Sequence, residues 1–289
     1  MIEDIINNAN SSVGYDKDAY IKKKREQLDQ AYKTIDEAVE ELKNSPEFFN
    51  QYLNVQSRFD MYTPRNALLV AKQLPTAMQL KERKDWVEAK ITFKERYPKK
   101  IIIIEPRESY VNKDGKTITP YNAKEVIDIS ETNTKPSTKS YDKKMVLQAL
   151  LLELKNSGIA IKAVDSLENG KMCDWNKEEN AIFIQKTDNF DLAIGAIAGE
   201  LAKISLYENT NEIDNDKVEC ISYMICKKYG IDVPTESINK LAKKYSDMES
   251  QDIINDLTSM KEVVLDINSR MGQNLELNKR EKGNKEQER

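Results

Sequence analysis

Apolar residues recur at helical spacing near the start of the chain. Leu28, Ile35 and Leu42 repeat at intervals of seven residues, and smaller apolar residues fill the positions between them. A stripe of this period is typical of an amphipathic helix that buries one face. The pattern predicts one long helix over residues 17–44.

Two hydroxyl–proline pairs mark the next helices. Ser45-Pro46 and Thr63-Pro64 each place a hydroxyl side chain immediately before a proline. A hydroxyl can cap the free backbone amides of a helix, and proline is favoured at the first helical position because no amide hydrogen is needed there. The pairs predict helices from residue 46 to about 57 and from residue 64 to 73.

Short apolar runs predict strands on both sides of a polar segment, residues 130–142, that has no apolar periodicity. Before this segment, strands are expected at "KKIIIIEP" and "AKEVIDIS", with a hairpin at "VNKDGKTI" between them. After it, a helix over about 142–156 precedes a strand at "GIAIKAV" and a hairpin made by "GKMCDW" and "NAIFIQK".

Helices are predicted for the remainder. Asp188 can cap a helix that runs to about residue 208, a second helix over 215–229 ends at Gly230, and the helical pattern continues to about residue 271. The last residues are charged and poor in apolar side chains, which predicts disorder.

This order predicts an α+β protein with two domains. We expect a flexible N-terminus (1–16), a first domain of helices and strands (17–135), a mostly helical second domain with a small sheet (136–271), and a disordered tail (272–289).

Composition agrees with a folded protein outside the membrane. Hydrophobic residues make up 39% of the 289 residues, yet no run of 18 apolar residues occurs, and the first residues lack the apolar stretch of a signal peptide. Cys173, Cys220 and Cys226 form no C-x-x-C pair, which predicts free thiols and a cytoplasmic location.

Charge is distributed unevenly. The net charge is −4, but residues 58–100 hold eleven Lys and Arg against five Asp and Glu, so this window is net +6 and the remainder is net −10. A basic region of this kind favours an anionic partner.

The segment "GAIAGELAK" (195–203) has the frame of a metal-binding helix. Histidines at positions 199 and 203 would make it the zinc-protease motif, in which two histidines one turn apart bind the metal and the glutamate between them polarises water. The chain has no histidine, and Gly199 and Lys203 stand at these positions beside Glu200. We therefore expect no metal, no cofactor and no enzymatic activity. The alternative is an ordinary buried helix whose glycines, Gly195 and Gly199, let another backbone approach closely.

The order of hairpin, GELAK helix and following helix resembles the zincin-like C-terminal half of ArdC-type antirestriction and plasmid-transfer proteins. That family has HELAH, then a helix that begins with a glutamate and ends in a Tyr-Gly-Ile/Leu-Asp turn. The matching residues are Glu200, Leu201, Ala202, Glu219 and Tyr229–Asp232, and the departures are Gly199 and Lys203. The resemblance implies a degenerate zincin site made of Gly199, Glu200, Lys203 and Glu219.

Residues 57–106 resemble the N-terminal single-stranded-DNA-binding domain of the same family. The matching features are Arg65-Asn66 at a helix start, an apolar tract, Trp86, and a basic turn before "IIIIEP"; this turn, "KERYPKK", lacks the glycine common in the family. "YNAKEVIDISETN" continues the resemblance, which covers roughly residues 20–245.

The residue types in this window favour nucleic-acid binding, independently of the family resemblance. Binding a single strand requires cations for the phosphates and aromatic faces for the bases. Core packing of the aromatics and solvation of the lysines are the alternatives. The candidate DNA contacts are Arg58, Tyr62, Arg65, Asn66, Lys72, Trp86, Lys90, Lys94, Arg96 and Lys99.

The sequence thus predicts a protein of a mobile genetic element that binds single-stranded DNA and acts in antirestriction, with no membrane contact. A host restriction or other defence protein is the candidate second partner. The alternative is a protein-binding inhibitor of a host enzyme that targets nucleic acid, with the acidic second half imitating DNA.

Overall fold

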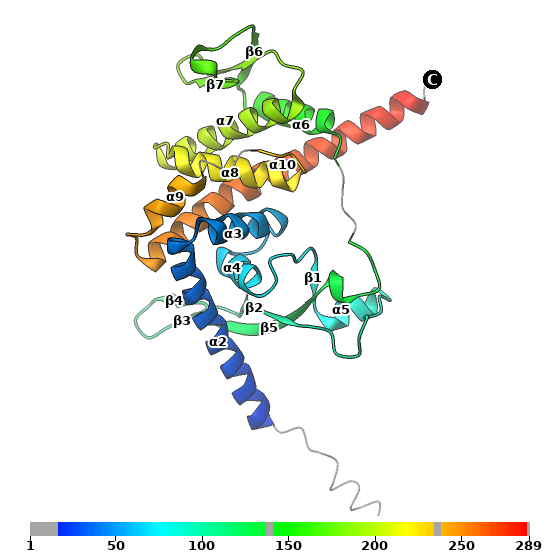
Figure 1. Cartoon of the computed structure of the whole chain (residues 1–289), viewed down its shortest axis with the longest axis vertical. Coiled ribbons are helices and arrows are strands. Elements are labelled where there is room, and N and C mark those ends of the chain that lie inside the picture. The colour runs from blue at the N-terminus through cyan, green and yellow to red at the C-terminus, as the bar shows by residue number, and fades with distance from the viewer. Residues whose placement is uncertain (1–16, 137–140, 234–237, 288–289) are drawn as a thin grey trace, which may run out of the picture.

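The computed structural model describes residues 17–136, 141–233 and 238–287. Helices form most of it, and the strands form three small sheets (Figure 1). The helices are α2 (Lys17–Asn44), α3 (Pro46–Arg58), α4 (Pro64–Gln73), α5 (Arg83–Glu88), α6 (Lys143–Asn156), α7 (Phe190–Thr210), α8 (Asn215–Lys228), α9 (Ile238–Tyr245) and α10 (Ser250–Gln287), with 3-10 turns η1 (Ile129–Glu131) and η2 (Glu168–Gly170). The strands are β1 (Leu80–Lys81), β2 (Ile101–Pro106), β3 (Tyr110–Val111), β4 (Thr117–Ile118), β5 (Tyr121–Asp128), β6 (Ala160–Val164), β7 (Cys173–Asn176) and β8 (Ala181–Gln185).

The predicted helix starts are confirmed in the first half. The Ser45 hydroxyl accepts a hydrogen bond from the Phe48 amide at 3.0 Å, and the Thr63 hydroxyl accepts one from the Asn66 amide at 3.4 Å. The prediction that Asp188 caps α7 was wrong by one residue. Because the helix begins at Phe190, Asn189 occupies the capping position, and its side chain accepts from the Leu192 amide at 3.1 Å.

Side-chain amides of α4 pair with the edge strand of the first sheet. This sheet has the order β1-β5-β2, and β2 pairs antiparallel with β5. The Asn66 amide both donates to the Ile104 carbonyl and accepts from the Ile104 amide, each at 2.8 Å. Gln73 does the same for Ile102, at 2.7 and 2.8 Å. Two side chains thus complete the hydrogen bonds that an edge strand otherwise leaves open.

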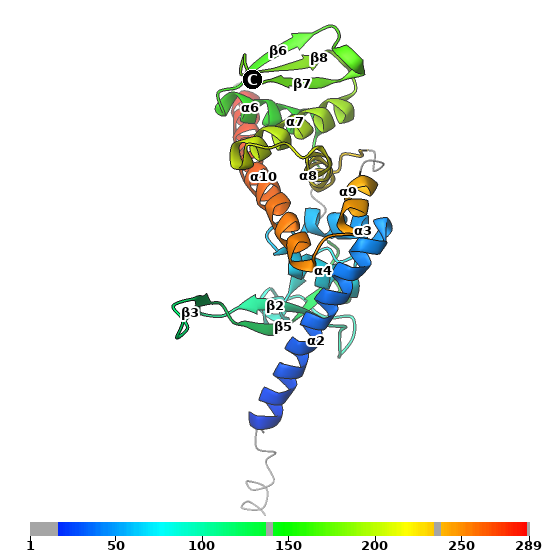
Figure 2. The same cartoon turned by 90° about the vertical axis from the view of Figure 1, so that its left-hand side faces the viewer.

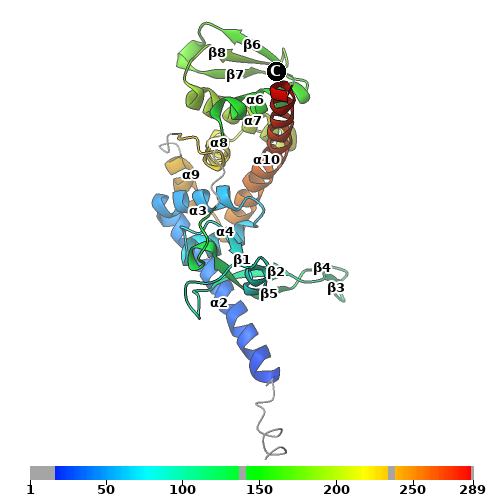
Figure 3. The same ribbon diagram turned by 90° about the vertical axis from the view of Figure 1, so that its right-hand side faces the viewer.

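The second sheet covers α6 and α7 at one end of the molecule (Figure 2). Its order is β6-β8-β7, with β8 parallel to β6 and antiparallel to β7. The third sheet is the hairpin β3-β4, which projects from the body beside β2 and β5 (Figures 2 and 3). The predicted hairpins at 111–118 and 170–186 are therefore both present.

One hydrophobic core runs through both halves. Helix α3 packs against α8 and α9, α2 packs against α9, and α10 contacts α4, α6, α7 and α8. Buried side chains from Ala31 to Leu275 form a continuous cluster that contains all three cysteines, each a free thiol. The division into two domains stays a prediction, and the predicted flexible segment 1–16 lies outside the described residues.

Helix α10 differs from the expected disordered tail. Its backbone is helical beyond residue 271, the Leu275 side chain is 4% exposed, and the Asn274 amide donates to the Ala149 carbonyl at 3.2 Å. Met271 and Leu275 extend the apolar stripe by one turn, so packing outweighs the charge-rich composition.

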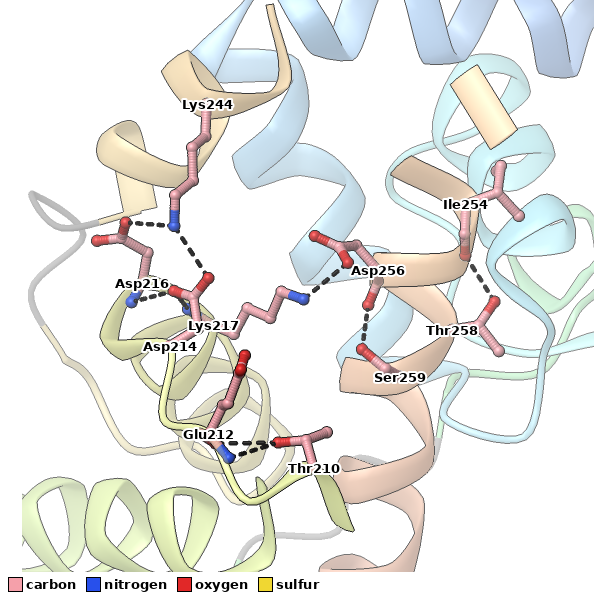
Figure 4. Close-up of polar contacts among 10 residues, drawn as sticks. All are labelled: Thr210, Glu212, Asp214, Asp216, Lys217, Lys244, Ile254, Asp256, Thr258 and Ser259. Carbon is pink, nitrogen blue, oxygen red and sulfur yellow. Dashed lines mark hydrogen bonds and ion pairs between the residues drawn. The ribbon is translucent and has the colours of Figure 1, made fainter. Parts of the chain in front are cut away.

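A polar cluster ties the start of α8 to α9 and α10 (Figure 4). Asp214 caps α8 by accepting from the amides of Asp216 and Lys217, and its other oxygen pairs with Lys244 of α9 at 2.9 Å. The Lys217 ammonium reaches Asp256 of α10 at 2.7 Å. Desolvation tends to raise the pKa of Asp214, but hydrogen bonds from Lys244 and the two amides outweigh it and hold the pKa below its ordinary value.

Replacing Asn66 by leucine is expected to cost about 2–4 kcal/mol of unfolding free energy, because the buried Ile104 amide and carbonyl both lose their partner. Gln73→Leu is the matched control. Ile102 is only half-buried, so water can replace the glutamine at a cost of about 1 kcal/mol. Urea unfolding followed by tryptophan fluorescence measures both, and equal losses would contradict a special role for Asn66.

Lys244→Met is expected to lower the melting temperature slightly at pH 7, since exposed ion pairs contribute up to about 1 kcal/mol. A carboxylate with a depressed folded pKa stabilises the fold above its unfolded pKa of 3.8 and loses this contribution as pH falls through the folded value. The difference from wild type should therefore shrink as pH falls below 3.8 and Asp214 becomes protonated in the folded state. Lys243→Met, on the same helix, is the control, and a difference independent of pH would exclude the pairing with Asp214.

Candidate functional site

A basic cleft lies between α2, α5 and the strands β2 and β5. It has a volume of 780 Å³. Seven cationic side chains and three carboxylates line it, together with Tyr20 and Tyr121. The cations are Lys24, Arg25, Arg83, Lys84, Lys100, Arg107 and Lys124, and the carboxylates are Glu82, Glu105 and Glu125.

The three carboxylates are held by two of the lysines. Lys124 lies 2.8 Å from Glu82 and 2.7 Å from Glu105, and its hydrogen bonds to Glu105 and Glu82 raise the pKa of its ammonium. Lys100 lies 2.5 Å from Glu125 and, against desolvation, lowers the pKa of that carboxyl by its hydrogen bond.

The other cations of the cleft are less engaged. Lys84 is 3.6 Å from Glu82, and Lys24 donates to the Ala123 carbonyl at 3.3 Å. Arg25 and Arg107 form no ion pair with any described residue, and the Arg83 guanidinium lies 4.6 Å from the centre of the Phe93 ring. An excess of positive charge therefore remains for an anionic ligand.

Tyr121 links the basic cleft to a second cavity of 380 Å³, which we call the Arg65 cavity. Arg65 and Tyr32 line it, and Ser250 and Gln251 at the start of α10 form another wall. Arg65 is in the first turn of α4, and Asp36 is the one carboxylate among the lining residues. The two cavities share Tyr121 as a lining residue, and we call them together the path.

The sequence candidates fall into three groups. Arg65 lines the path. Lys90, Lys94, Arg96 and Lys99 are exposed on the loop after α5 and do not line the basic cleft, although the Arg96 guanidinium lies 5.3 Å from the centre of the exposed Tyr97 ring. Lys72 lies on the far end of α4 and pairs with Glu41 at 2.5 Å.

Arg58, Asn66 and Trp86 use their polar groups in internal hydrogen bonds, and their contact with DNA stays a prediction. The Arg58 guanidinium donates to the carbonyls of Ala77 (2.9 Å) and Pro75, and desolvation lowers its pKa. The Trp86 ring is 1% exposed, and its indole nitrogen donates to the Ile127 carbonyl at 3.0 Å.

Tyr62 is half-buried and stacks on Phe59, with ring centres 5.2 Å apart. Its ring lines another cavity, which shares Glu82, Glu105 and Lys124 with the basic cleft. Tyr62 therefore lies beside the basic cleft and is not part of its lining, and its contact with DNA stays a prediction.

Sequence reasoning missed Lys24, Arg25, Arg107 and Lys124. A signal was present for two of them, since Lys22–Arg25 is a run of four cations on the predicted first helix. Arg107 and Lys124 come from segments that pairing of β2 with β5 brings together, which no local pattern reveals.

In the second half, Glu200 is fixed by two partners. Its carboxylate accepts from the Trp175 amide of β7 at 3.1 Å and pairs with Lys203 at 2.9 Å. The two side chains are 15% and 21% exposed. Lys203 and Glu200, three residues apart, thus meet on one face of α7, and no ion pair among the described residues joins Lys203 to Glu219.

The glycines of α7 face α8. The Ser222 hydroxyl of α8 donates to the Gly195 carbonyl at 3.0 Å, and a Cβ at Gly195 would lie 3.1 Å from the Val233 side chain. The neighbours of both glycines are side chains, so the close approach of another backbone that the alternative interpretation predicted is not seen. Gly199 and Glu219 line the same cavity between α7 and α8, whereas Glu200 and Lys203 do not.

The residues present do not fit a metal ion. Gly199 offers no ligand, Lys203 is a cation, and the Glu200 carboxylate is already engaged. Among the described residues, no group of three His, Cys, Asp or Glu side chains could hold a metal.

Glu200→Ala should destabilise the protein more than Lys203→Ala, by about 1–3 kcal/mol against about 1 kcal/mol, because it leaves both the Trp175 amide and the Lys203 ammonium without a partner. Glu200→Gln keeps an acceptor for the amide and should resemble Lys203→Ala. Thermal unfolding by circular dichroism ranks the three variants. A larger loss in Lys203→Ala would mean that Lys203 has another carboxylate partner.

No protein-family model and no curated protein matches the chain. Among solved structures, the metal-free crystal structure of the antirestriction ArdC protein from the R388 plasmid matches with a TM-score of 0.50 and 10% identity, over 74% of this chain and 85% of that chain. The Mn(II)-bound structure of the same protein gives a TM-score of 0.49 and 11% identity over the same shares. The resemblance predicted from the sequence is thus confirmed at the level of the fold: this chain has a fold similar to that of ArdC.

Proposed function

We propose that this protein binds single-stranded DNA along the path formed by the basic cleft and the Arg65 cavity, and that it acts in antirestriction for a mobile genetic element. The basic cleft is the observation that carries the proposal. A flexible, anionic strand requires a groove with surplus cations, and this groove has seven cations against three carboxylates.

The aromatic side chains of the path suit unpaired bases. Tyr121 lines both cavities, Tyr20 lines the basic cleft, and Tyr32 lines the Arg65 cavity. A duplex hides the faces of its bases, whereas a single strand can turn them onto aromatic rings. This arrangement supports single-stranded DNA over duplex.

The second half is proposed to have no catalytic activity. The GELAK segment retains the glutamate of a zinc-protease helix, but its carboxylate accepts from a backbone amide and pairs with Lys203. A water-polarising base requires a free carboxylate beside a metal. The fold similarity to ArdC supports an antirestriction role, and the residues support binding as its means.

Imitation of DNA by the acidic residues is less well supported. In the second half, Asp191, Asp214 and Asp256 are each paired with a lysine. A surface that imitates DNA needs rows of unneutralised carboxylates. Inhibition of a defence enzyme by protein contact alone is therefore the less favoured function.

Fluorescence anisotropy with a labelled oligothymidylate tests the proposal. Arg25→Gln, Arg65→Gln and Arg107→Gln should each weaken binding and reduce the slope of log affinity against log salt by about 0.7 for each phosphate that the variant no longer neutralises. Lys33→Gln is the matched control, because Lys33 is on α2 but outside both cavities. Tyr121→Leu should weaken binding by about 1–3 kcal/mol at every salt concentration and leave the slope unchanged.

The proposal fails if wild-type protein does not bind the oligonucleotide at about 50 mM salt, where phosphate contacts are strong. It also fails if Lys33→Gln weakens binding as much as the cleft variants. Equal affinity for duplex and single strand would remove the role given to the tyrosines.

A further inference from the structure

A cavity of 640 Å³ lies between α7 and α8, on the face of α7 that carries its glycines. We call it the α7–α8 cavity. Gly195 and Gly199 line the cavity and put no side chain into it, and its apolar lining residues include Leu192, Val218 and Val233. These walls suit a chain of methylene groups.

The charged groups of this cavity are all acceptors. Asp191, Glu219 and Asp232 line it, and no lysine or arginine is among its lining residues. Asp232 is exposed at the rim, where Lys227 binds it at 3.0 Å. Lys203, which the sequence placed here, turns to Glu200 instead.

Two of the carboxylates keep oxygens that no described residue pairs with. One oxygen of Asp191 pairs with Lys143 at 2.7 Å, but the other is buried and has no partner among the described residues. Glu219 forms no ion pair with any described residue. Partial desolvation raises the pKa of its carboxyl; the charge of Asp216 raises this pKa further, and the charge of Lys240 lowers it. The Glu219 side chain is exposed, but the Asp191 oxygen is buried, and a buried carboxylate oxygen without a donor is costly, so a ligand with an N–H group would relieve it.

We propose that the α7–α8 cavity binds an alkylammonium or alkylguanidinium group, carried by a lysine or arginine side chain of a polypeptide or by a free polyamine. The methylene groups pack against the apolar walls, and the cationic end donates to Asp191 and Glu219. A metal ion does not satisfy the same site, because apolar walls and two carboxylates provide too few ligands. The proposal does not depend on DNA binding.

Isothermal titration calorimetry of the full chain, without DNA, tests it. The probes are acetyl-Leu-Lys-Leu-amide, the same peptide with norleucine in place of lysine, and putrescine. The lysine peptide should bind at least about tenfold more tightly than the norleucine peptide, because only lysine donates to the carboxylates. Putrescine shows whether the cavity accepts a free amine or requires the side chain of a polypeptide.

Two variants and one control locate the binding. Glu219→Gln should weaken lysine-peptide binding about tenfold. Gly199→Leu should abolish it, because a Cβ there meets nothing nearer than the Ser222 hydroxyl at 3.9 Å and the rest of the side chain can fill the cavity. Glu208→Gln removes an exposed carboxylate from the same helix, outside the cavity, and should change nothing.

Binding of putrescine alone, with the same response to the variants, would support the site and assign the source to free amines. Equal binding of the lysine and norleucine peptides would overturn the proposal, as would no binding by either the peptide or putrescine. Equal weakening by Glu208→Gln and Glu219→Gln would also overturn it, because net charge rather than the cavity would then explain the affinity.

Discussion

The unpaired edge of β2 is the constraint on which the first half depends. A buried strand edge must find donors and acceptors, and here they come from a helix rather than from another strand. Asn66 and Gln73 are seven residues apart, which spans about 10.5 Å along a helix, while their partners Ile104 and Ile102 span about 6.8 Å along a strand. The side chains bridge this difference and fix the rotation of α4. That rotation turns the neighbouring Arg65 into its cavity, so the same contacts that close the sheet also position a candidate phosphate ligand.

In the second half, a carboxylate and two glycines have structural tasks. Glu200 joins α7 to β7 through the Trp175 amide, and Lys203 neutralises it. Gly195 leaves room for the Val233 side chain, and its carbonyl accepts from the Ser222 hydroxyl of α8. Glu200, Lys203 and Gly195 therefore each have a structural role that involves no metal, whereas Gly199 lines the α7–α8 cavity. Glu219 lines the α7–α8 cavity, is exposed, and forms no ion pair with any described residue.

Local signals predicted most of the helices and strands. Serine or threonine before proline located α3 and α4 to within one residue, and apolar period located α2, because capping and amphipathicity depend on neighbouring residues only. The short elements β1 and α5 gave no such signal. Helix α10 extended further than its composition indicated, since the packing of Leu275 is decided by residues far away in sequence. Trp86 was ambiguous for the same reason: an indole suits a stacked base or a core, and only the Ile127 carbonyl decides between them.

Charge was the least predictable property. The window 58–100 is net +6 in sequence, but Arg58 binds backbone carbonyls, Lys72 pairs with Glu41, and the loop cations lie away from the basic cleft. Three of the seven cleft cations, Arg83, Lys84 and Lys100, belong to this window, and the other four come from α2, from β5 and from the residue after β2. Counting charges in a sequence window includes residues that lie far apart in the folded protein, and it leaves out residues from other segments that the fold brings close together. The field at a groove depends on which carboxylates lie within a Debye length of about 8 Å, and only tertiary structure sets those distances. A protein of net charge −4 can therefore present a cationic surface to a nucleic acid.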